Sequence, residues 1–505
     1  MHRLLPAVAV CLLLASCGTS SPEVSVSRSL QHTILTEASV PTEVSTPSPT
    51  SDPTAPDSTV GGTASGPRGV GDVLFPDLGN PGIDVTHYDV DLSYVPGPAT
   101  LQATETLIIV ATTDLSEFSL DSAGPRITSV SIDGTTAGFV AESPELVITP
   151  PARIAKGNSF EATIVYSVTP ASSTSPVGVD NGWFPTAGGS YVMNEPDGAR
   201  TWLPSNDHPS DKASFRFTLH VPPAVTGVAN GRLEAHTSDS GGETWIWSET
   251  DPMATYLIQV LTGAYTIIDG TGPNGLPLSS VVFTADRATM QPFVDAIPTE
   301  IEFFEQYFGP FPLQSYGIAI TDSSSGLAME EQGRSLFSRD DFVSGRLGET
   351  EQLLLSHELA HQWFGDAVSP ARWQDIWLNE SFATYGEWMW LEHVGMRTVA
   401  AAASESLQRR HSGGGSTAKP TAETMFDFEV YEGGAVVLQA LRLTIGDAAF
   451  FALLSSWVHD NVGASRTTED FIALAARVSG RDLTTFFGDW LYATSLPAAL
   501  PAAIN

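Results

Sequence analysis

Cysteine is scarce in this sequence, and both of its cysteines lie near the N-terminus. The chain has 505 residues but only two cysteines, Cys11 and Cys17. No disulfide can therefore form within the part of the chain that follows residue 17, whichever compartment holds it. The stability of that part has to come from packing and from any bound metal.

Positive charge is also scarce. The sequence has 23 Lys and Arg against 58 Asp and Glu, a formal net charge of -35. A chain of this kind has no basic surface for phosphate backbones, so nucleic acid is not an expected partner. The acidity is typical of a soluble surface outside the cytoplasm; the alternative is that some carboxylates repel acidic substrates or attract basic ones. The length allows two or three domains, each with its own core.

Residues 1–17 have the pattern of a targeting segment. Two basic or titratable residues, His2 and Arg3, precede an apolar run over residues 4–14 that is too short to span a bilayer comfortably. The run ends in Leu-Ala-Ser-Cys at residues 14–17. This ending resembles the lipobox of bacterial lipoproteins, which implies cleavage before Cys17, export, and a lipid on Cys17 that anchors the protein to the outer face of the cell membrane. An ordinary secretory signal with Cys17 as an incidental thiol is the alternative.

The rest of the chain divides by composition into a linker and two domains. Residues 18–72 are rich in Ser, Thr and Pro with few aromatics, which predicts a disordered linker. Residues 73–266 alternate apolar and polar side chains in short runs between turn residues, which predicts an N-terminal antiparallel β domain. The clearest of these runs are residues 87–92, 104–110, 160–166 and 215–221.

Residues 267–505 carry mainly helical patterns, so the predicted fold class is α+β. One strand is expected over residues 316–320. The first expected helix begins at Pro298 and ends at Gly309. Further helices are expected over residues 350–364, 375–394 and 433–445, and over parts of 468–492 on either side of Gly480.

A metal-binding pattern lies inside the helix expected over residues 350–364. His357 and His361 are four residues apart, so both imidazoles project from one face of the helix and can reach one tetrahedral ion. Glu358 then points beside that face, where it can contact a water rather than the metal. On its own this five-residue match is weak, because a helix with two surface histidines has the same pattern.

A second helix strengthens the metal hypothesis. Glu380 lies on the helix expected over residues 375–394, with residues 362–379 between it and His361. That helix can fold back antiparallel to the first and bring the carboxylate to the same ion. Two His and one Glu leave a fourth position open, as in catalytic zinc sites. Cobalt or manganese can also bind to this ligand set. We therefore predict one Zn²⁺ per chain, bound by His357, His361 and Glu380, with Glu358 as general base.

At these residues the chain resembles the aminopeptidase N family of gluzincin metallopeptidases, over most of residues 83–498. The resemblance implies a thermolysin-like catalytic domain over residues 267–505 behind the β domain, and peptides as substrates. We also expect a monomer. The sequence Leu-Ala-Met-Glu-Glu at residues 327–331 is similar to the family's Gly-x-Met-Glu-Asn motif. It implies that Glu330 binds the substrate's free α-amine, and that Ala328 and Met329 line the substrate. Glu331 departs from the motif, where the family has Asn.

Two more matches imply further roles. Glu195, five residues before Arg200, is similar to the family residue of the β domain that helps to bind the amine. A carboxylate in a turn is the alternative. Tyr431 aligns with the family tyrosine that donates a hydrogen bond to the oxyanion, although Gly433 replaces the usual lysine. A core tyrosine is the alternative there.

The resulting prediction is a zinc aminopeptidase that removes N-terminal residues from peptides outside the cytoplasm. Metal and base activate the water that attacks the scissile carbonyl, and Tyr431 stabilises the oxyanion. An endopeptidase or epoxide hydrolase on the same site is one alternative, and a non-catalytic surface binding lipoprotein is the other. The chain ends soon after Pro497, which favours a short form without the C-terminal helical domain of larger members and thus a more open cleft.

Overall fold

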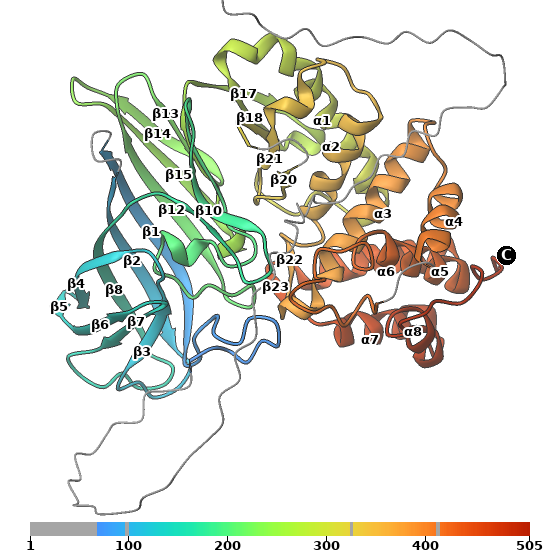
Figure 1. The fold of residues 1–505 in the computed structure, drawn as a ribbon, viewed down its shortest axis with the longest axis horizontal. Helices are drawn as coiled ribbons and strands as arrows, with labels where there is room; N and C mark the ends of the chain where they lie inside the picture. Colours follow the sequence, from blue (N-terminus) through green and yellow to red (C-terminus); the bar gives the residue numbers. More distant parts are fainter. Residues whose placement is uncertain (1–67, 96–99, 324–326, 411–414, 505) are drawn as a thin grey trace, which may run out of the picture.

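The computed structural model describes residues 68–95, 100–323, 327–410 and 415–504. It confirms an α+β protein in which a β domain is followed by a mainly helical domain (Figure 1). The lipobox, Cys17 and most of the expected linker lie outside the described residues. Within the described ranges, no helix combines the length and the apolar character that crossing a bilayer requires.

The largest sheet of the β domain has eight strands, and every strand expected in residues 73–266 belongs to it. Its neighbours are antiparallel except β1 and β12, which pair in parallel, so the domain is not purely antiparallel. Buried and more exposed side chains alternate along β2, β8 and β12, which is the expected period of two. In spatial order the strands are β14 (Arg232–Ser238), β15 (Glu243–Ala254), β12 (Lys212–Val221), β1 (Ile83–Val95), β2 (Thr100–Ala111), β8 (Ser159–Val168), β4 (Arg126–Ile132) and β5 (Thr135–Thr136).

Two smaller sheets complete the β domain. One contains β13 (Thr226–Ala229), β16 (Val260–Gly263), β11 (Gly189–Met193), β10 (Asp180–Pro185) and β9 (Ser172–Thr174). The other contains β3 (Phe118–Asp121), β7 (Glu145–Thr149) and β6 (Gly138–Glu142). The next strand, β17 (Tyr265–Thr271), pairs with β18 (Pro277–Phe283) in a sheet of the helical domain. The division between domains therefore falls between β16 and β17, just before the predicted boundary at residue 267.

The helical domain begins with a five-stranded sheet and continues with helices. The sheet has the order β17, β18, β19 (Ile318–Thr321), β21 (Ser335–Ser338) and β20 (Ala328–Met329), and a small pair joins β22 (Val368–Pro370) to β23 (Ala464–Arg466). The helices are α1 (Arg287–Phe308), α2 (Glu349–His361), α3 (Trp377–His393), α4 (Val399–Arg410), α5 (Glu432–Ile445), α6 (Asp447–Asn461), α7 (Thr468–Ser479) and α8 (Thr484–Trp490). Helix α3 packs between α2 and α5.

The expected start of the first helix is wrong. Proline is favoured in the first turn of a helix, which suggested that Pro298 opens it. In the structure α1 begins at Arg287 and holds both Pro292 and Pro298 in its interior. Each proline costs one backbone hydrogen bond. Burial of apolar side chains such as Phe293 and Phe304 against the rest of the domain outweighs that cost.

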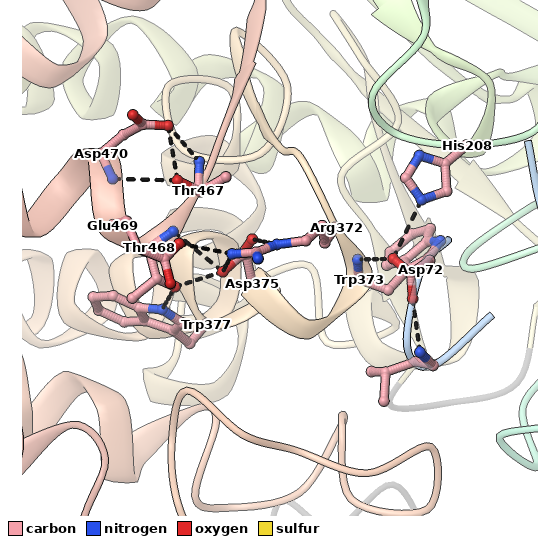
Figure 2. Close-up of polar contacts among 11 residues, drawn as sticks. Asp72, His208, Arg372, Trp373, Asp375, Trp377, Thr467, Thr468, Glu469 and Asp470 are labelled. Carbon is pink, nitrogen blue, oxygen red and sulfur yellow. Dashed lines mark hydrogen bonds and ion pairs between the residues drawn. The ribbon is translucent and has the colours of Figure 1, made fainter. Parts of the chain in front are cut away.

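The segment before β1 binds both domains through one carboxylate. Asp72, which was placed in the linker, is buried and accepts hydrogen bonds from the backbone N–H of Trp373 at 2.7 Å and from Nε2 of His208 at 3.2 Å (Figure 2). Because Ser210 N donates to His208 Nδ1, the imidazole proton is on Nε2 and points at Asp72. Asp72 thus connects the β domain to the residues that precede α3.

The start of α3 is held from its other side as well. The carboxylate of Asp375 accepts hydrogen bonds from the hydroxyl of Thr468 in α7 at 2.6 Å and from Nε of Arg372 at 2.8 Å (Figure 2). Trp377 Nε1 donates to the same Thr468 hydroxyl at 2.8 Å. These contacts fix the first turn of the helix that carries Glu380.

Candidate metal centre and active site

His357 and His361 meet on one face of α2, as the spacing of four residues requires. Both side chains are buried, and their Nε2 atoms lie 3.0 Å apart. Helix α2 brings them there because its neighbours in the sequence, including Leu359 and Trp363, are fully buried and fix the orientation of the helix. The two imidazoles therefore present their nitrogens to one point.

Glu380 reaches the same point from α3. Its Oε2 lies 3.4 Å from Nε2 of His357 and 3.4 Å from Nε2 of His361. Ligand atoms bound at about 2.0–2.1 Å to a tetrahedral zinc are about 3.3 Å apart, so these separations fit such an ion. The chain thus brings two nitrogens and one carboxylate oxygen into the arrangement of an open zinc site.

The hydrogen bonds on the far side of each imidazole show why a cation belongs there. His357 Nδ1 donates to Glu387 at 2.5 Å, and His361 Nδ1 donates to the carbonyl of Phe364 at 3.1 Å. With the proton on Nδ1, each neutral imidazole turns its Nε2 lone pair toward the other and toward Glu380. Three electron-rich atoms converge on one point, and a metal ion satisfies all three.

The surrounding charges favour a cation too. Burial alone would lower the pKa of His361, but the negative charges of Glu330 and Glu380 raise it well above the usual value. Burial alone would raise the pKa of Glu380, yet His361 and the hydrogen bond with His357 lower it to about 2. Glu380 is therefore ionised at neutral pH, as a metal ligand must be.

Glu358 lies beside the three ligands. One carboxylate oxygen of Glu358, one of Glu330 and a ring nitrogen of His361 all lie within 4.8 Å of one another. Burial raises the pKa of Glu358 to about 7; the imidazoles of His357 and His361 oppose this shift, and the charge of Glu330 adds to it. A carboxylate whose pKa is near neutrality can both take and return a proton.

Two carboxylates from different domains form an acidic wall next to the metal ligands. Oxygens of Glu195, which follows β11 in the β domain, and of Glu330 lie within 4.8 Å of each other and of an oxygen of Glu380. Burial and the charge of Glu330 raise the pKa of Glu195. Both Glu195 Oε1 and Glu330 Oε1 are buried without a hydrogen-bond partner among the described residues. Two such oxygens are suited to receive a charged donor such as an ammonium.

The backbone of Glu330 is hydrogen-bonded to the residue that follows α2. Gln362, one residue after His361, donates from Nε2 to the carbonyl of Glu330 at 3.0 Å and accepts from the N–H of Gly333 at 2.8 Å. Ala328 and Met329 precede Glu330 as β20, which pairs with β21 and has no other strand neighbour in the described sheet. Met329 is buried, whereas Ala328 is half-buried.

Tyr431 lies next to His357, immediately before α5. Its ring is nearly parallel to that of His357, with 6.1 Å between the centroids. Burial raises the pKa of the Tyr431 phenol well above its usual value, and the charges of Glu380 and Glu195 add to this. The phenol therefore keeps its proton and is a hydrogen-bond donor at neutral pH.

Comparison with known families decides to which family this arrangement belongs. The sequence family of the peptidase M1 N-terminal domain matches residues 85–257, and the sequence family of the peptidase family M1 domain matches residues 294–490. A crystal structure of an M1 zinc metallopeptidase from Deinococcus radiodurans superposes with a TM-score of 0.79 at 32% identity, covering 86% of this chain and 100% of that one. The chain belongs to peptidase family M1. The resemblance to aminopeptidase N is confirmed, and family and ligand set together identify Zn²⁺ as the cofactor.

Curated relatives of the M1 chain are aminopeptidases of greater length. Probable aminopeptidase 2 of Sulfurisphaera tokodaii is 27% identical over 405 residues, which is 76% of this chain and 50% of that protein. Aminopeptidase N of Lactococcus lactis subsp. lactis is 30% identical over 337 residues, or 61% of this chain and 39% of that protein. The chain therefore spans about half, or less, of the length of these relatives. A mutant of the Deinococcus enzyme has been crystallised with a Tyr-Ser-Ala substrate, and its chain matches with a TM-score of 0.79.

Sequence reasoning missed one residue of this M1 site. Glu387 accepts a hydrogen bond from Nδ1 of His357 and so fixes the orientation and tautomer of that imidazole. Its position gave a usable signal, because it lies seven residues after Glu380, two turns along the same face of α3.

The structure also places Glu331, the residue that departs from the family motif. Its side chain is fully buried, and Oε2 accepts a hydrogen bond from Gln259 Nε2 at 2.6 Å. Gln259 Oε1 in turn accepts from Arg334 Nη1 at 2.8 Å. Burial raises the pKa of Glu331 well above its usual value. Glu331 therefore belongs to a buried network that includes Gln259 of the β domain, whereas Glu330 faces the metal ligands.

Proposed function

We propose that the chain is a zinc-dependent aminopeptidase that hydrolyses the first peptide bond of peptides outside the cytoplasm. The observation that carries the proposal is the distance between the acidic wall and the metal ligands. An ammonium held by Glu195 and Glu330 lies next to Glu380, since oxygens of all three are within 4.8 Å of one another. In a peptide the α-amine nitrogen is only about 2.5 Å from the carbonyl carbon of its own residue. The first carbonyl is therefore the one that reaches the metal.

The chain's own residues supply the remaining chemistry. Bound zinc lowers the pKa of water towards about 7 and polarises a carbonyl. Glu358 accepts the proton of the attacking water and passes it to the departing amine. The phenol of Tyr431 donates a hydrogen bond to the oxygen of the scissile carbonyl as negative charge develops on it, an effect of about 10²–10³ in rate for donors of this kind.

Strand β20 offers a way to align the rest of the peptide. Because β20 is an edge of its sheet, an extended peptide can pair with its free side by strand addition. The half-buried Ala328 and the backbone of its neighbour Met329 would make these contacts. Peptides methylated on backbone nitrogens beyond the cleaved bond should then be turned over more slowly. Equal turnover of methylated and unmethylated peptides would contradict this role of β20.

The activity is tested with a panel of aminoacyl fluorogenic amides and matched peptides. The wild-type chain should cleave them, and a chelator or the Glu358→Gln substitution should abolish cleavage. Glu330→Ala should raise KM for free peptides, because the ammonium loses a partner. Acetylation of the N-terminus should prevent cleavage of the same peptides. Retained cleavage of acetylated peptides would instead indicate an endopeptidase, and full activity of Glu358→Gln would overturn the mechanism.

For the location, we propose a monomeric lipoprotein anchored through Cys17 to the outer face of the cell membrane. The support is the lipobox at residues 14–17. Labelled palmitate fed to producing cells should mark the wild-type protein and not a Cys17→Ser variant. Absence of label from the wild type would contradict the lipid anchor and favour an ordinary secreted protein. Light scattering of the purified chain measures its mass and so tests whether it is a monomer.

A further inference from the structure

The turn that carries Tyr431 is held by side chains from two other helices. Residues 427–431 form a tight turn before α5, in which the N–H of Val430 donates to the carbonyl of Asp427 at 2.9 Å. The hydroxyl of Ser381, the residue after the metal ligand Glu380, donates to the carbonyl of Val430 at 2.5 Å. One anchor of the turn is thus α3, the helix that carries Glu380.

The second anchor is Arg410, the last residue of α4. Its guanidinium is buried and donates from Nη1 to the carbonyl of Glu429 at 3.3 Å and to the hydroxyl of Thr417 at 2.7 Å. Thr417 itself donates to the same carbonyl of Glu429 at 2.9 Å. From Nη2 the guanidinium also donates to the carbonyl of Gly415 at 3.0 Å. Arg410 therefore binds the turn two residues before Tyr431 and links it to the segment that follows α4.

Two glycines after Tyr431 make room for these anchors. A Cβ atom at Gly433 would lie 2.3 Å from Nη1 of Arg410 and 3.2 Å from the carbonyl oxygen of Phe428. A Cβ atom at Gly434 would lie 1.7 Å from Oγ of Ser381. The distances of 2.3 Å and 1.7 Å are shorter than any van der Waals contact. A side chain at Gly433 would therefore collide with Arg410, and one at Gly434 with Ser381. The guanidinium occupies the space in which a side chain at residue 433 would begin.

We propose that Arg410 is a positioning residue for Tyr431, a role that rests on the proposed function of Tyr431 as oxyanion donor. A planar guanidinium with several fixed donors holds the turn more rigidly than a single flexible donor. Without it, the turn keeps the hydrogen bonds from Ser381 and from Thr417. Thr417 then lacks its own guanidinium partner, so the turn can move the phenol relative to His357. Displacement of a catalytic donor by about 1 Å can cost up to about 10²-fold in rate.

The test combines Arg410→Met with Tyr431→Phe. Arg410→Met should lower kcat by about 10-fold and leave KM within about twofold, because the donor acts on the transition state. In the Tyr431→Phe background the same substitution should change kcat by less than about twofold, since there is no phenol left to position. An equal loss of kcat in both backgrounds would overturn the proposal, as would wild-type kcat in Arg410→Met.

A second variant keeps the test informative should Arg410→Met fold poorly. Gly433→Ala introduces the Cβ that collides with Nη1 of Arg410 while leaving the guanidinium in the chain. It should reduce kcat as Arg410→Met does, and it should add little further loss to Arg410→Met. Full activity of Gly433→Ala would contradict the proposal. Thermal unfolding of every variant separates lost stability from lost positioning.

The matched control is Arg397→Met, which removes an arginine paired with Glu405 of α4. Its kcat should equal that of the wild type. The outcomes separate the two proposals. If Tyr431→Phe leaves kcat unchanged, the proposed role of the tyrosine is wrong and the role of Arg410 is wrong with it. If Tyr431→Phe is slow while Arg410→Met and Gly433→Ala are fully active, only the role of Arg410 is wrong.

Discussion

The amide of Asn379 donates a hydrogen bond from Nδ2 to the hydroxyl of Tyr256 at 3.1 Å. Asn379 immediately precedes the ligand Glu380 on α3, whereas Tyr256 belongs to the β domain. The same hydroxyl donates to the carbonyl of Gly365 at 3.2 Å, shortly after the end of α2. One phenol of the β domain therefore connects the two segments that supply all three metal ligands.

Loss of the Tyr256 hydroxyl should weaken metal binding. In Tyr256→Phe the buried amide of Asn379 loses its acceptor, which should cost about 1–3 kcal/mol of stability. Partners of this kind typically change metal affinity by about 10–100-fold, and we expect a loss near the lower end. Competition with a fluorescent chelator measures the zinc affinity. Tyr88→Phe is the matched control, since it removes a buried hydroxyl that bonds Asn206 within the β domain; equal zinc affinities in both variants would refute the link.

Glu387→Gln should reduce zinc affinity by about 10–100-fold, because a neutral amide binds the Nδ1 proton of His357 less strongly than a carboxylate does. The ligand itself is untouched, so saturating zinc should restore most of kcat. The same competition assay, followed by activity at rising zinc concentrations, checks both expectations. Unchanged affinity would show that the 2.5 Å contact between Glu387 and His357 has no role in binding the metal.

Asp72→Ala should destabilise both domains together. It leaves the N–H of Trp373 and Nε2 of His208 without their acceptor, at a cost of at least about 2 kcal/mol. Denaturant unfolding measures this loss, and Asp77→Ala, an exposed carboxylate of the same segment, is the control. Loss of stability equal to that of the control would mean that the segment before β1 adds nothing to the fold.

The pKa of Asp72 sets the pH range of this effect. Burial alone would raise that pKa, but the hydrogen bonds from His208 and Trp373 lower it below the usual value. The folded state therefore takes up a proton less readily than the unfolded state. Asp72 stabilises the fold above its unfolded pKa of about 3.9, and this contribution is lost as the pH falls through the folded pKa. The difference between Asp72→Ala and wild type should accordingly shrink in acid.

The acid limb of kcat/KM should report Glu358. The base must be ionised, so activity falls as the pH drops through its pKa. Burial raises that pKa to about 7, and a bound cation lowers it, so the limb is expected between about 4.3, the ordinary value of a glutamate, and 7. Glu330→Gln removes a negative neighbour and should move the limb to lower pH. A limb that moves upward in this variant would exclude Glu358 as the titrating group.

Much of the fold could be predicted because the local patterns are strong. Period-two runs placed β1, β2, β8 and β12, and α2, α3 and α5 begin and end within a few residues of the expected positions. The errors came where tertiary packing outweighs local preference. Packing keeps two prolines inside α1, and the parallel pairing of β1 with β12 depends on a contact between residues far apart in the sequence.

By itself the sequence predicted the candidate metal ligands and the proposed base. A helix repeats every 3.6 residues, so the spacing of His357, Glu358 and His361 decides which side chains share a face. The distance to Glu380 is long enough for a second helix to fold back. Such spacings are local properties, and they hold in any fold that keeps the two helices together.

For Glu195 and Tyr431 the sequence offered only a family resemblance, and only the tertiary structure decided where they lie relative to the metal ligands. Glu195 follows a strand of the β domain, and Tyr431 precedes a helix that packs on α3, so no spacing relates either of them to the metal ligands. Their positions depend on packing between domains and on contacts such as those of Ser381, Arg410 and Tyr256. These contacts join residues distant in the sequence, and their geometry arises only when the apolar surfaces of both domains are buried together.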